Sequence, residues 1–351
     1  MSTMRAFITN GDGSGSVQSI PRPTPGHGEI LVKIHYAALN PGDWKLVEGN
    51  VAASPAPQGL IAGCDFAGTV EDANGSHWDL GHRVGGWVHG TTYQGVGAFA
   101  EFMTIEATLV FAIPDNISFQ QASTISLAFA TATQAMYRQM TLPNPYDDNG
   151  IRENILIYGA STSVGQYAVQ LGKLSGLRVI AISSAKNHNL LKRLGADATL
   201  DYHDDDWVDR VKELTQDKLR YALDVIAEAD SSETVACALI RRNGAHLVAL
   251  APVDKEALRA INSYIKAESI IAFTVFGKPL AYTVFDNAGD ATPEDKRAWE
   301  EYLLWLPKML EQGDLKPNHV KEVGTLDDVL EGFRLSKEGR LSAEKAVFRV
   351  A

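Results

Sequence analysis

The pattern of apolar and polar positions changes character after about the first third of the chain. Up to about Ser118, short apolar runs separated by Gly, Pro and Asn predict strands, and residues 30–36 and 66–70 are the clearest. From Asn154 onwards, apolar runs alternate with segments of helical period. The predicted strands there are residues 154–158, 178–182, 198–202, 221–226 and 245–250, and the predicted helices are 166–175, 187–194, 205–215 and 231–241. This alternation is typical of an α/β fold with a doubly wound parallel sheet.

The alternation stops after about Phe276. A helix is then predicted at residues 293–312 and a strand at 345–350. Because 351 residues exceed the usual size of one compact core, we expect two domains. In the simplest arrangement the C-terminal strand rejoins the β-rich part. Residues 1–120 and 276–351 would then form one domain, and residues 121–275 would form the α/β domain.

A loop of small residues follows the first strand of the α/β region and leads into a helix. It runs from Gly159 to Gly165, and this order places backbone N–H groups and a helix N-terminus against a pyrophosphate. The residues expected to bind that group are Ser161, Thr162, Ser163 and Val164. A serine stands where the middle glycine of G-x-G-x-x-G is common, and helix capping by Ser or Thr is a compatible alternative.

The segment after the second strand indicates which dinucleotide binds. An NAD site usually has Asp or Glu there for the ribose 2′-OH, whereas this chain has Ser184 and Lys186. A carboxylate would repel a 2′-phosphate, but a lysine and a hydroxyl would bind it. We therefore predict NADPH as the cofactor. Asn187 is included in this site and is also expected to cap the next helix.

Composition and charge narrow the function classes. Hydrophobic residues make up 45% of the chain and charged residues 21%, as in ordinary globular enzymes. The net charge of −11 argues against nucleic-acid binding, and no apolar run is long enough to span a membrane. The two cysteines, Cys64 and Cys237, exclude a disulfide framework. Without a recognisable signal peptide, we expect a cytoplasmic protein.

Five motifs together resemble the medium-chain dehydrogenase/reductase family over essentially the whole chain. They are ALNPGDWK at 38–45, GCDFAG at 63–68, GAFAE at 97–101, the loop at 158–165 and LGAD at 194–197. Within the family, the Asn-Pro-x-Asp-x-Lys, Gly-Cys-Asp-Phe-Ala-Gly and Ser-x-Lys-Asn patterns are most similar to fungal trans-acting enoyl reductases. The resemblance implies a Rossmann domain and a β-rich, GroES-like catalytic domain.

The chain departs from the zinc-dependent members of that family. Those members have Cys where this chain has Asn40, and a His-Glu pair where it has Cys64 and Asp65. A catalytic zinc needs three protein ligands, and the four-cysteine loop for a structural zinc is absent. We therefore predict no metal. Without zinc, conjugate reduction of an α,β-unsaturated carbonyl is easier to support than alcohol oxidation.

The same resemblance assigns roles in both predicted domains. It places the turn before Lys45 beside the nicotinamide, so Lys45 is the candidate catalytic residue, and the alternative is a solvated surface lysine. It also matches Tyr202 to a tyrosine that covers the 2′-phosphate. Leu250 and Ala251 lie where doubly wound sheets form their crevice. The expected cofactor site further includes Gly42, Asp43, Trp44, Thr131, Ala346 and Val347.

Two apolar segments are expected to form the substrate wall. Their residues are Ser126, Phe129 and Thr133 in the first segment, and Thr274, Val275, Phe276 and Gly277 in the second. Apolar side chains there suit an acyl chain, although core packing explains such stretches equally well.

The leading interpretation is an NADPH-dependent trans-acting enoyl reductase of polyketide biosynthesis. Its substrate would be an acyl thioester, presented on the carrier domain of a synthase or free. The alternatives are a free enone or quinone reductase, a non-redox isomerase or cyclase, and a silent NADPH-binding partner. An edge strand expected at 282–285 is interrupted upstream by Lys278 and Pro279, which favours a monomer.

Overall fold

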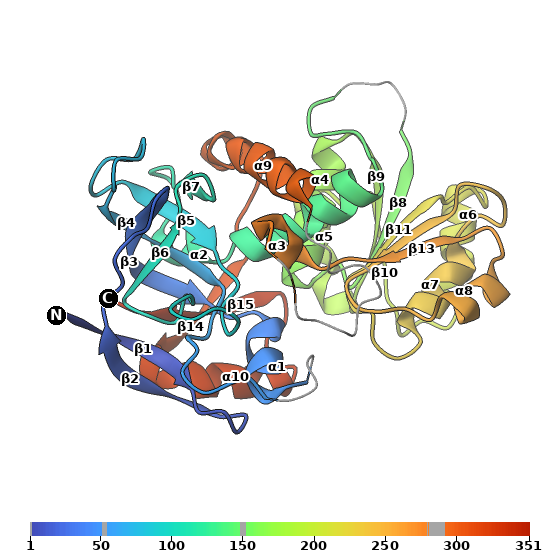
Figure 1. The fold of residues 1–351 in the computed structure, drawn as a ribbon. Helices are drawn as coiled ribbons and strands as arrows, with labels where there is room; N and C mark the ends of the chain where they lie inside the picture. The colour runs from blue at the N-terminus through green and yellow to red at the C-terminus, as the bar shows by residue number, and fades with distance from the viewer. Residues whose placement is uncertain (1, 51–54, 148–151, 279, 281–291) are drawn as a thin grey trace. The chain divides into compact units, whose positions relative to one another are not determined.

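The computed structural model describes residues 2–50, 55–147, 152–278, 280 and 292–351, and its chain divides into two compact units (Figure 1). Unit 1 comprises Met1–Leu127 and Trp299–Ala351, and unit 2 comprises Ala128–Ala298. Residues 121–127 belong to unit 1, although the sequence pattern assigned them to the α/β domain. Residues 276–298 belong to unit 2, although the pattern assigned them to the other domain. The edge expected at 282–285 lies outside the described residues.

Unit 1 is built around an antiparallel-rich sheet with strand order β14-β15-β3-β4-β5-β7, and β6 also pairs with β3. A separate hairpin is formed by β1 and β2. The strands are β1 Thr3–Thr9, β2 Gly15–Pro21, β3 Glu29–Ala38, β4 Asp65–Asp72, β5 Arg83–Trp87, β6 Phe102–Glu106, β7 Val110–Ala112, β14 His319–Thr325 and β15 Glu344–Arg349. Its helices are α1 Pro41–Glu48, α2 Phe119–Ser123, η4 Leu326–Asp328 and α10 Val329–Lys337.

Strand β15 joins the C-terminal part of the chain to the N-terminal strands. It pairs antiparallel with β3, with Val347 opposite Ala38, and parallel with β14. Beside it, buried aromatic rings fill the core: Phe348 meets Phe99 edge to face, with ring centroids 5.4 Å apart. The sheet of unit 1 therefore contains strands from both ends of the sequence.

Unit 2 contains the predicted doubly wound sheet, and that fold class is confirmed (Figure 1). Six parallel strands lie in the order β10-β9-β8-β11-β12-β13. They are β8 Asn154–Tyr158, β9 Arg178–Ile182, β10 Ala198–Leu200, β11 Tyr221–Asp224, β12 His246–Ala249 and β13 Lys266–Ser269. The order reverses between β8 and β11, which is where such sheets form their ligand crevice.

Helices follow the strands of unit 2 at the expected places. They are α4 Ser163–Leu174, η2 Ala185–Asn187, α5 His188–Leu194, α6 Trp207–Thr215, α7 Ser231–Ala238, α8 Lys255–Ile261 and η3 Ala272–Phe276. The π-helix η1 Gln134–Gln139 follows α3 Ser126–Thr133, and α9 is Pro293–Gln312. The boundaries between units 1 and 2 fall within α3 and α9. In the described part of the chain, no helix combines the length and apolarity needed to cross a bilayer.

Two strand ends differ from the prediction because carboxylates turn the chain. Strand β11 ends at Asp224, and not at Ile226, because its Oδ1 accepts the N–H groups of Ile226 and Ala227. Strand β10 ends at Leu200 because Asp201 accepts the N–H of His203, two residues further on. Such Asx turns compete with strand pairing and favour a turn.

Candidate functional site

The loop between β8 and α4 offers backbone donors that the protein itself leaves unused. Ser161, Ser163 and Val164 are partly exposed, and no described residue accepts their N–H groups. Ser163 and Val164 open helix α4, where the first N–H groups lack partners and the helix dipole is positive. Their place at the turning point of the sheet order gives this loop the geometry that suits an anion.

Thr162 takes the capping role that the sequence left open for this loop. Its N–H and its hydroxyl both donate to the carbonyl of Gly159, at 3.0 and 2.8 Å, and its hydroxyl accepts the N–H of Gly165 at 3.1 Å. Thr162 therefore caps the helix and shapes the loop, and its donors do not point to a ligand. A Cβ at Gly165 would lie 2.4 Å from the Gly159 carbonyl oxygen, so this turn requires glycine.

Two of the residues expected at the 2′-phosphate are in contact. The hydroxyl of Ser184 donates to the phenol oxygen of Tyr202 at 3.0 Å, and 41% of Tyr202 is exposed. Lys186 is exposed two residues after Ser184, and it forms no ion pair with a described carboxylate. Two hydroxyls and an ammonium on one exposed edge form a set of donors that suits a phosphate.

The carboxylate of Asp201, which was not among the predicted site residues, stabilises the edge formed by the Ser184 and Tyr202 segments. Asp201 accepts the N–H of Ala185 at 2.8 Å and the N–H and ring nitrogen of His203 at 3.0 and 2.7 Å. These bonds lower its pKa to about 2, with the His203 N–H the largest cause. The carboxylate links the Ser184 segment to the Tyr202 segment. The available signal was an Asp within the last residues of the strand predicted at 198–202.

Asn187 does not cap helix α5 as predicted. Its side chain makes no capping bond, and its φ of −97° and ψ of −5° belong to the preceding 3-10 turn. A capping residue normally has extended backbone, so the turn at 185–187 removes the geometry that a cap needs. Leu250 and Ala251 lie, as expected, just after β12 at the carboxyl edge of the sheet, and both are partly exposed.

The segment around Lys45 forms the short helix α1 in unit 1. Asn40 and Asp43 make a capping box, in which Asp43 accepts the N–H of Asn40 at 2.7 Å. Asp43 is fully buried, so its side chain belongs to the interior, not to a cofactor surface. Trp44 donates from its indole nitrogen to Ser336 at 3.1 Å. Lys45 is partly exposed, and Gly42 adjoins Asp43 in the first turn.

Beneath this helix lies a buried polar cluster. Asp65 accepts hydrogen bonds from Lys345 at 2.6 Å, from Asn40 Nδ2 at 2.9 Å and from the N–H of Leu127 at 2.8 Å. Burial raises the pKa of Asp43 to about 7 and, with Asp43 beside it, raises the pKa of the Cys64 thiol well above its usual value. All these carboxyl and thiol groups are inaccessible to solvent.

This cluster does not suit a zinc ion. Zinc binds thiolate, imidazole or carboxylate, but the Asp65 carboxylate is occupied by an ammonium, and burial raises the pKa of the Cys64 thiol, which disfavours the thiolate. Asn40 donates its amide hydrogens to Asp65. Across the described ranges, no three His, Cys, Asp or Glu side chains are arranged to hold a metal.

The residues expected at the substrate and nicotinamide are mostly interior positions. Thr133 bonds back to its own helix, and Gln134 donates to the Thr274 hydroxyl at 2.7 Å. The remaining interior positions are Ser126, Phe129, Thr131, Val275, Phe276, Ala346 and Val347, each at most 9% exposed, whereas Gly277 is exposed. Core packing accounts for Phe129, whose ring meets Tyr167 edge to face.

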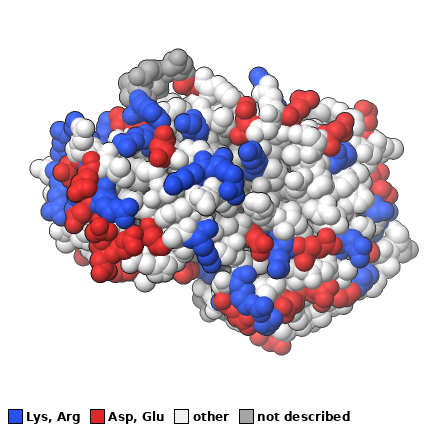
Figure 2. Space-filling model, turned by 180° about the vertical axis from the view of Figure 1, so that it is seen from behind, with Lys and Arg blue, Asp and Glu red and all other residues white. Residues whose placement is uncertain are grey.

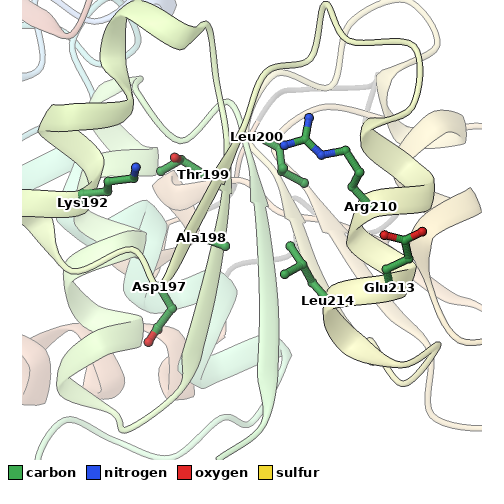
Figure 3. A pocket seen from close by; sticks show the side chains of 8 residues that line it. All are labelled: Lys192, Asp197, Ala198, Thr199, Leu200, Arg210, Glu213 and Leu214. Carbon is green, nitrogen blue, oxygen red and sulfur yellow. The ribbon is translucent and has the colours of Figure 1, made fainter.

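A pocket of about 520 Å³ lies elsewhere on unit 2, beside strand β10 (Figure 3). Its lining residues are Lys192, Asp197, Ala198, Thr199, Leu200, Arg210, Glu213 and Leu214. Its charged side chains carry both signs, and none of the residues expected at the cofactor or substrate lines it. The pocket is therefore separate from the loop at Ser161–Val164.

Comparison with known proteins adds the family context. The family described as alcohol dehydrogenase GroES-like domain matches residues 26–115, and the family described as zinc-binding dehydrogenase matches residues 163–287. A trans-enoyl reductase of Alternaria alternata is 33% identical over 359 residues, covering 100% of both chains. A trans-enoyl reductase of Trichoderma harzianum is 33% identical, covering 99% of this chain and 96% of the relative.

A solved structure has the same fold over the full length. The crystal structure of the CurK enoyl reductase superposes with a TM-score of 0.78, at 19% identity and with 100% of both chains covered. At that identity the likeness concerns the fold alone. The comparisons therefore match both the GroES-like part and the doubly wound part that the sequence predicts.

Proposed function

Since this chain belongs to the medium-chain dehydrogenase/reductase superfamily, in the family of the trans-enoyl reductases, we propose that it is an NADPH-dependent enoyl reductase. The proposed substrate is an α,β-unsaturated, polyketide-type acyl thioester. The observation that carries the proposal is the carboxyl edge of the unit 2 sheet. There, unused N–H groups of Ser163 and Val164 suit a pyrophosphate, and Ser184, Lys186 and Tyr202 suit a 2′-phosphate.

The proposed reaction, a conjugate reduction, follows from the chemistry of the buried cluster around Asp65 in unit 1. When bound, NADPH would supply a hydride to the β-carbon of the enoyl group. Negative charge then develops on the thioester carbonyl oxygen, and the protein must stabilise that charge and deliver a proton to the α-carbon. Because the Asp65 carboxylate is paired with Lys345, it is not free to bind a metal that would polarise an alcohol.

Lys45 is the proposed catalytic residue. Its ammonium lies 5.6 Å from the centroid of the Trp44 ring, on a helix whose first turn is fixed by the Asn40–Asp43 capping box. An ammonium held in this way suits a hydrogen bond to the nicotinamide ribose or to the enolate. Lys337 lies 5.8 Å from the same ring and pairs with Glu48, so it provides a matched comparison.

The decisive experiment incubates the protein with NADPH and a panel of enoyl thioesters and analyses the products by mass. A saturated thioester formed with equimolar NADPH oxidation supports the proposal. Faster turnover of simple enones or quinones would support a free enone or quinone reductase instead. Product formed without NADPH consumption would indicate an isomerase or cyclase, and binding without turnover would indicate a silent NADPH-binding protein.

The Lys45→Ala variant tests the catalytic assignment. We expect kcat to fall by about 10²-fold, because removing a donor to developing charge costs about that much. A higher Kd for NADPH in the same variant would indicate that Lys45 also bonds the nicotinamide ribose. Lys337→Ala should leave kcat unchanged. Equal effects of the two substitutions would show that Lys45 acts only on the Trp44 ring.

The way in which the substrate arrives is part of the proposal. A carrier domain of a polyketide synthase would present the thioester to a monomeric, cytoplasmic enzyme. Carrier domains are usually acidic, and the chain itself has a net charge of −11. On the face shown in Figure 2, basic and acidic side chains are interspersed. Docking would therefore depend on a local group of Lys and Arg rather than on the overall charge.

A further inference from the structure

One carboxylate in unit 1 holds three segments that are far apart in the sequence. Asp65, the first residue of β4, is fully buried. Its Oδ1 accepts the N–H of Leu127 at 2.8 Å, and its Oδ2 accepts the amide of Asn40 at 2.9 Å and the ammonium of Lys345 at 2.6 Å. The ammonium also lies 3.4 Å from the carbonyl oxygen of Thr124.

Each of these partners adjoins a part of the proposed site. Asn40 is the N-cap of α1, the helix that carries Lys45. Leu127 lies in the first turn of α3, next to Ser126 and four residues before Thr131. Lys345 precedes Ala346 and Val347 in β15. A single side chain therefore fixes the starting points of the three segments.

The charges of Asp65 and Lys345 are shielded from water, so they interact with each other and with their protein partners. The side chains of Lys345 and Asp65 are 2% and 0% exposed. Removing one member of a buried ion pair is strongly destabilising because it leaves an unpaired charge in the interior. Replacing both members by apolar residues often leaves stability unchanged. The pair is thus weak evidence for a role in stability alone, while its directed hydrogen bonds specify one geometry.

We propose that Asp65 and Lys345 are a positioning pair for the segments that adjoin the proposed site. The pair orients α1 and the beginning of α3, so that Lys45 is held in its reactive position. The role assigned to Lys45 rests on the proposed function, whereas the mechanical link between Asp65 and the three segments does not. Small displacements of catalytic groups cost about 10²-fold in rate, so this link matters for turnover.

The test uses the double variant D65N/K345M, which removes both charges together. Amide hydrogen exchange is followed in residues 40–48 and 126–133, alongside kcat, KM and the Kd for NADPH. The expected result is exchange about tenfold faster in 40–48 and kcat lower by about 10²-fold, with the Kd for NADPH within about threefold of wild type. If the double variant does not fold, Asp65→Glu, which keeps the charge but displaces it, is judged by the same criteria.

The matched control is Glu268→Gln in unit 2. Glu268 accepts a hydrogen bond from His246 at 2.7 Å and also pairs with Lys266, so it is another carboxylate that links two segments. This variant should change exchange only near β12 and β13 and leave kcat as in wild type.

Two results separate the inference from the proposed function. Unchanged exchange in residues 40–48 in a folded variant would overturn the positioning pair, as would an unchanged kcat. A wild-type protein that turns over no enoyl thioester would instead overturn the proposed function, and the exchange data would still decide whether Asp65 fixes α1.

Discussion

Polar groups play opposite parts in the buried cluster of unit 1 and at the exposed sheet edge of unit 2. In unit 1, the charged groups of Asp65 and Lys345 are buried and satisfy each other. In unit 2, the N–H groups at Ser163 and Val164 and the ammonium of Lys186 are accessible and have no partner among the described residues. Polar groups that the protein satisfies itself fix geometry, whereas polar groups left unused at a sheet edge are available to a ligand.

The largest expected effect comes from breaking the buried pair. Lys345→Met leaves the Asp65 carboxylate uncompensated in the interior, and the free energy of unfolding should fall by about 3–5 kcal/mol. Urea denaturation followed by circular dichroism measures this. Lys186→Ala, at an exposed lysine, should change stability by less than about 0.5 kcal/mol. A loss below about 1 kcal/mol in Lys345→Met would contradict the contrast between the units.

The next largest effect is expected from changing the shape of the loop at 159–165. In Gly165→Ala the new Cβ would meet the Gly159 carbonyl oxygen at 2.4 Å, so the loop must shift and the free N–H groups lose their direction. We expect a loss of about 2–3 kcal/mol in stability and a Kd for NADPH at least about tenfold higher, by fluorescence titration. Ser163→Ala retains the backbone donor and should bind nearly as well as wild type.

The next prediction tests whether the exposed sheet edge of unit 2 selects NADPH over NADH. Lys186→Ala should raise the KM for NADPH by about 10- to 100-fold, because a charge-assisted bond to phosphate is lost, and the KM for NADH by less than about threefold. Lys192→Ala removes another exposed lysine, two turns along, and serves as the control. Parallel increases for both cofactors would refute a 2′-phosphate site.

The smallest effect is a pH dependence of stability from the interior of unit 1. Burial raises the pKa of Asp43 to about 7 in the folded protein, from a usual value of 3.8. The folded state then holds a proton that the unfolded state has lost, so this group's contribution to stability decreases as pH rises from about 4 to 7. Between about pH 5.5 and 6.5 the decrease should be about 1 kcal/mol.

Asp43→Asn replaces the protonated acid by a group of similar shape that does not titrate. Urea denaturation at several pH values should therefore show a flatter stability profile for the variant than for wild type in this interval. Identical slopes would show that Asp43 remains ionised within the fold.

Much of the fold follows from local pattern, and the failures have local causes. Strands β8 and β9 match their predicted bounds, because buried parallel strands are continuous apolar runs. The ends of β10 and β11 were missed because Asp201 and Asp224 turn the chain through side-chain bonds that periodicity does not contain.

The sequence suggests candidate site residues where their geometry is local. The loop at 159–165 and the segment at 184–186 each lie within a few residues, and the structure puts their expected groups at one sheet edge. The cluster on Asp65 joins positions 40, 127 and 345. Only the tertiary fold brings these together, so no spacing in the sequence could reveal them.

The pairing of β15 with β3 has a consequence for biosynthesis. Unit 2 is one continuous stretch and can fold on the ribosome as soon as it has emerged. Strands β3 and β4 are made early, but the lysine for Asp65 is synthesised 280 residues later. Until then, the sheet of unit 1 lacks β15 and Asp65 lacks its ion-pair partner. During translation, the part of the chain made first can therefore complete its sheet only after the last strand has been made.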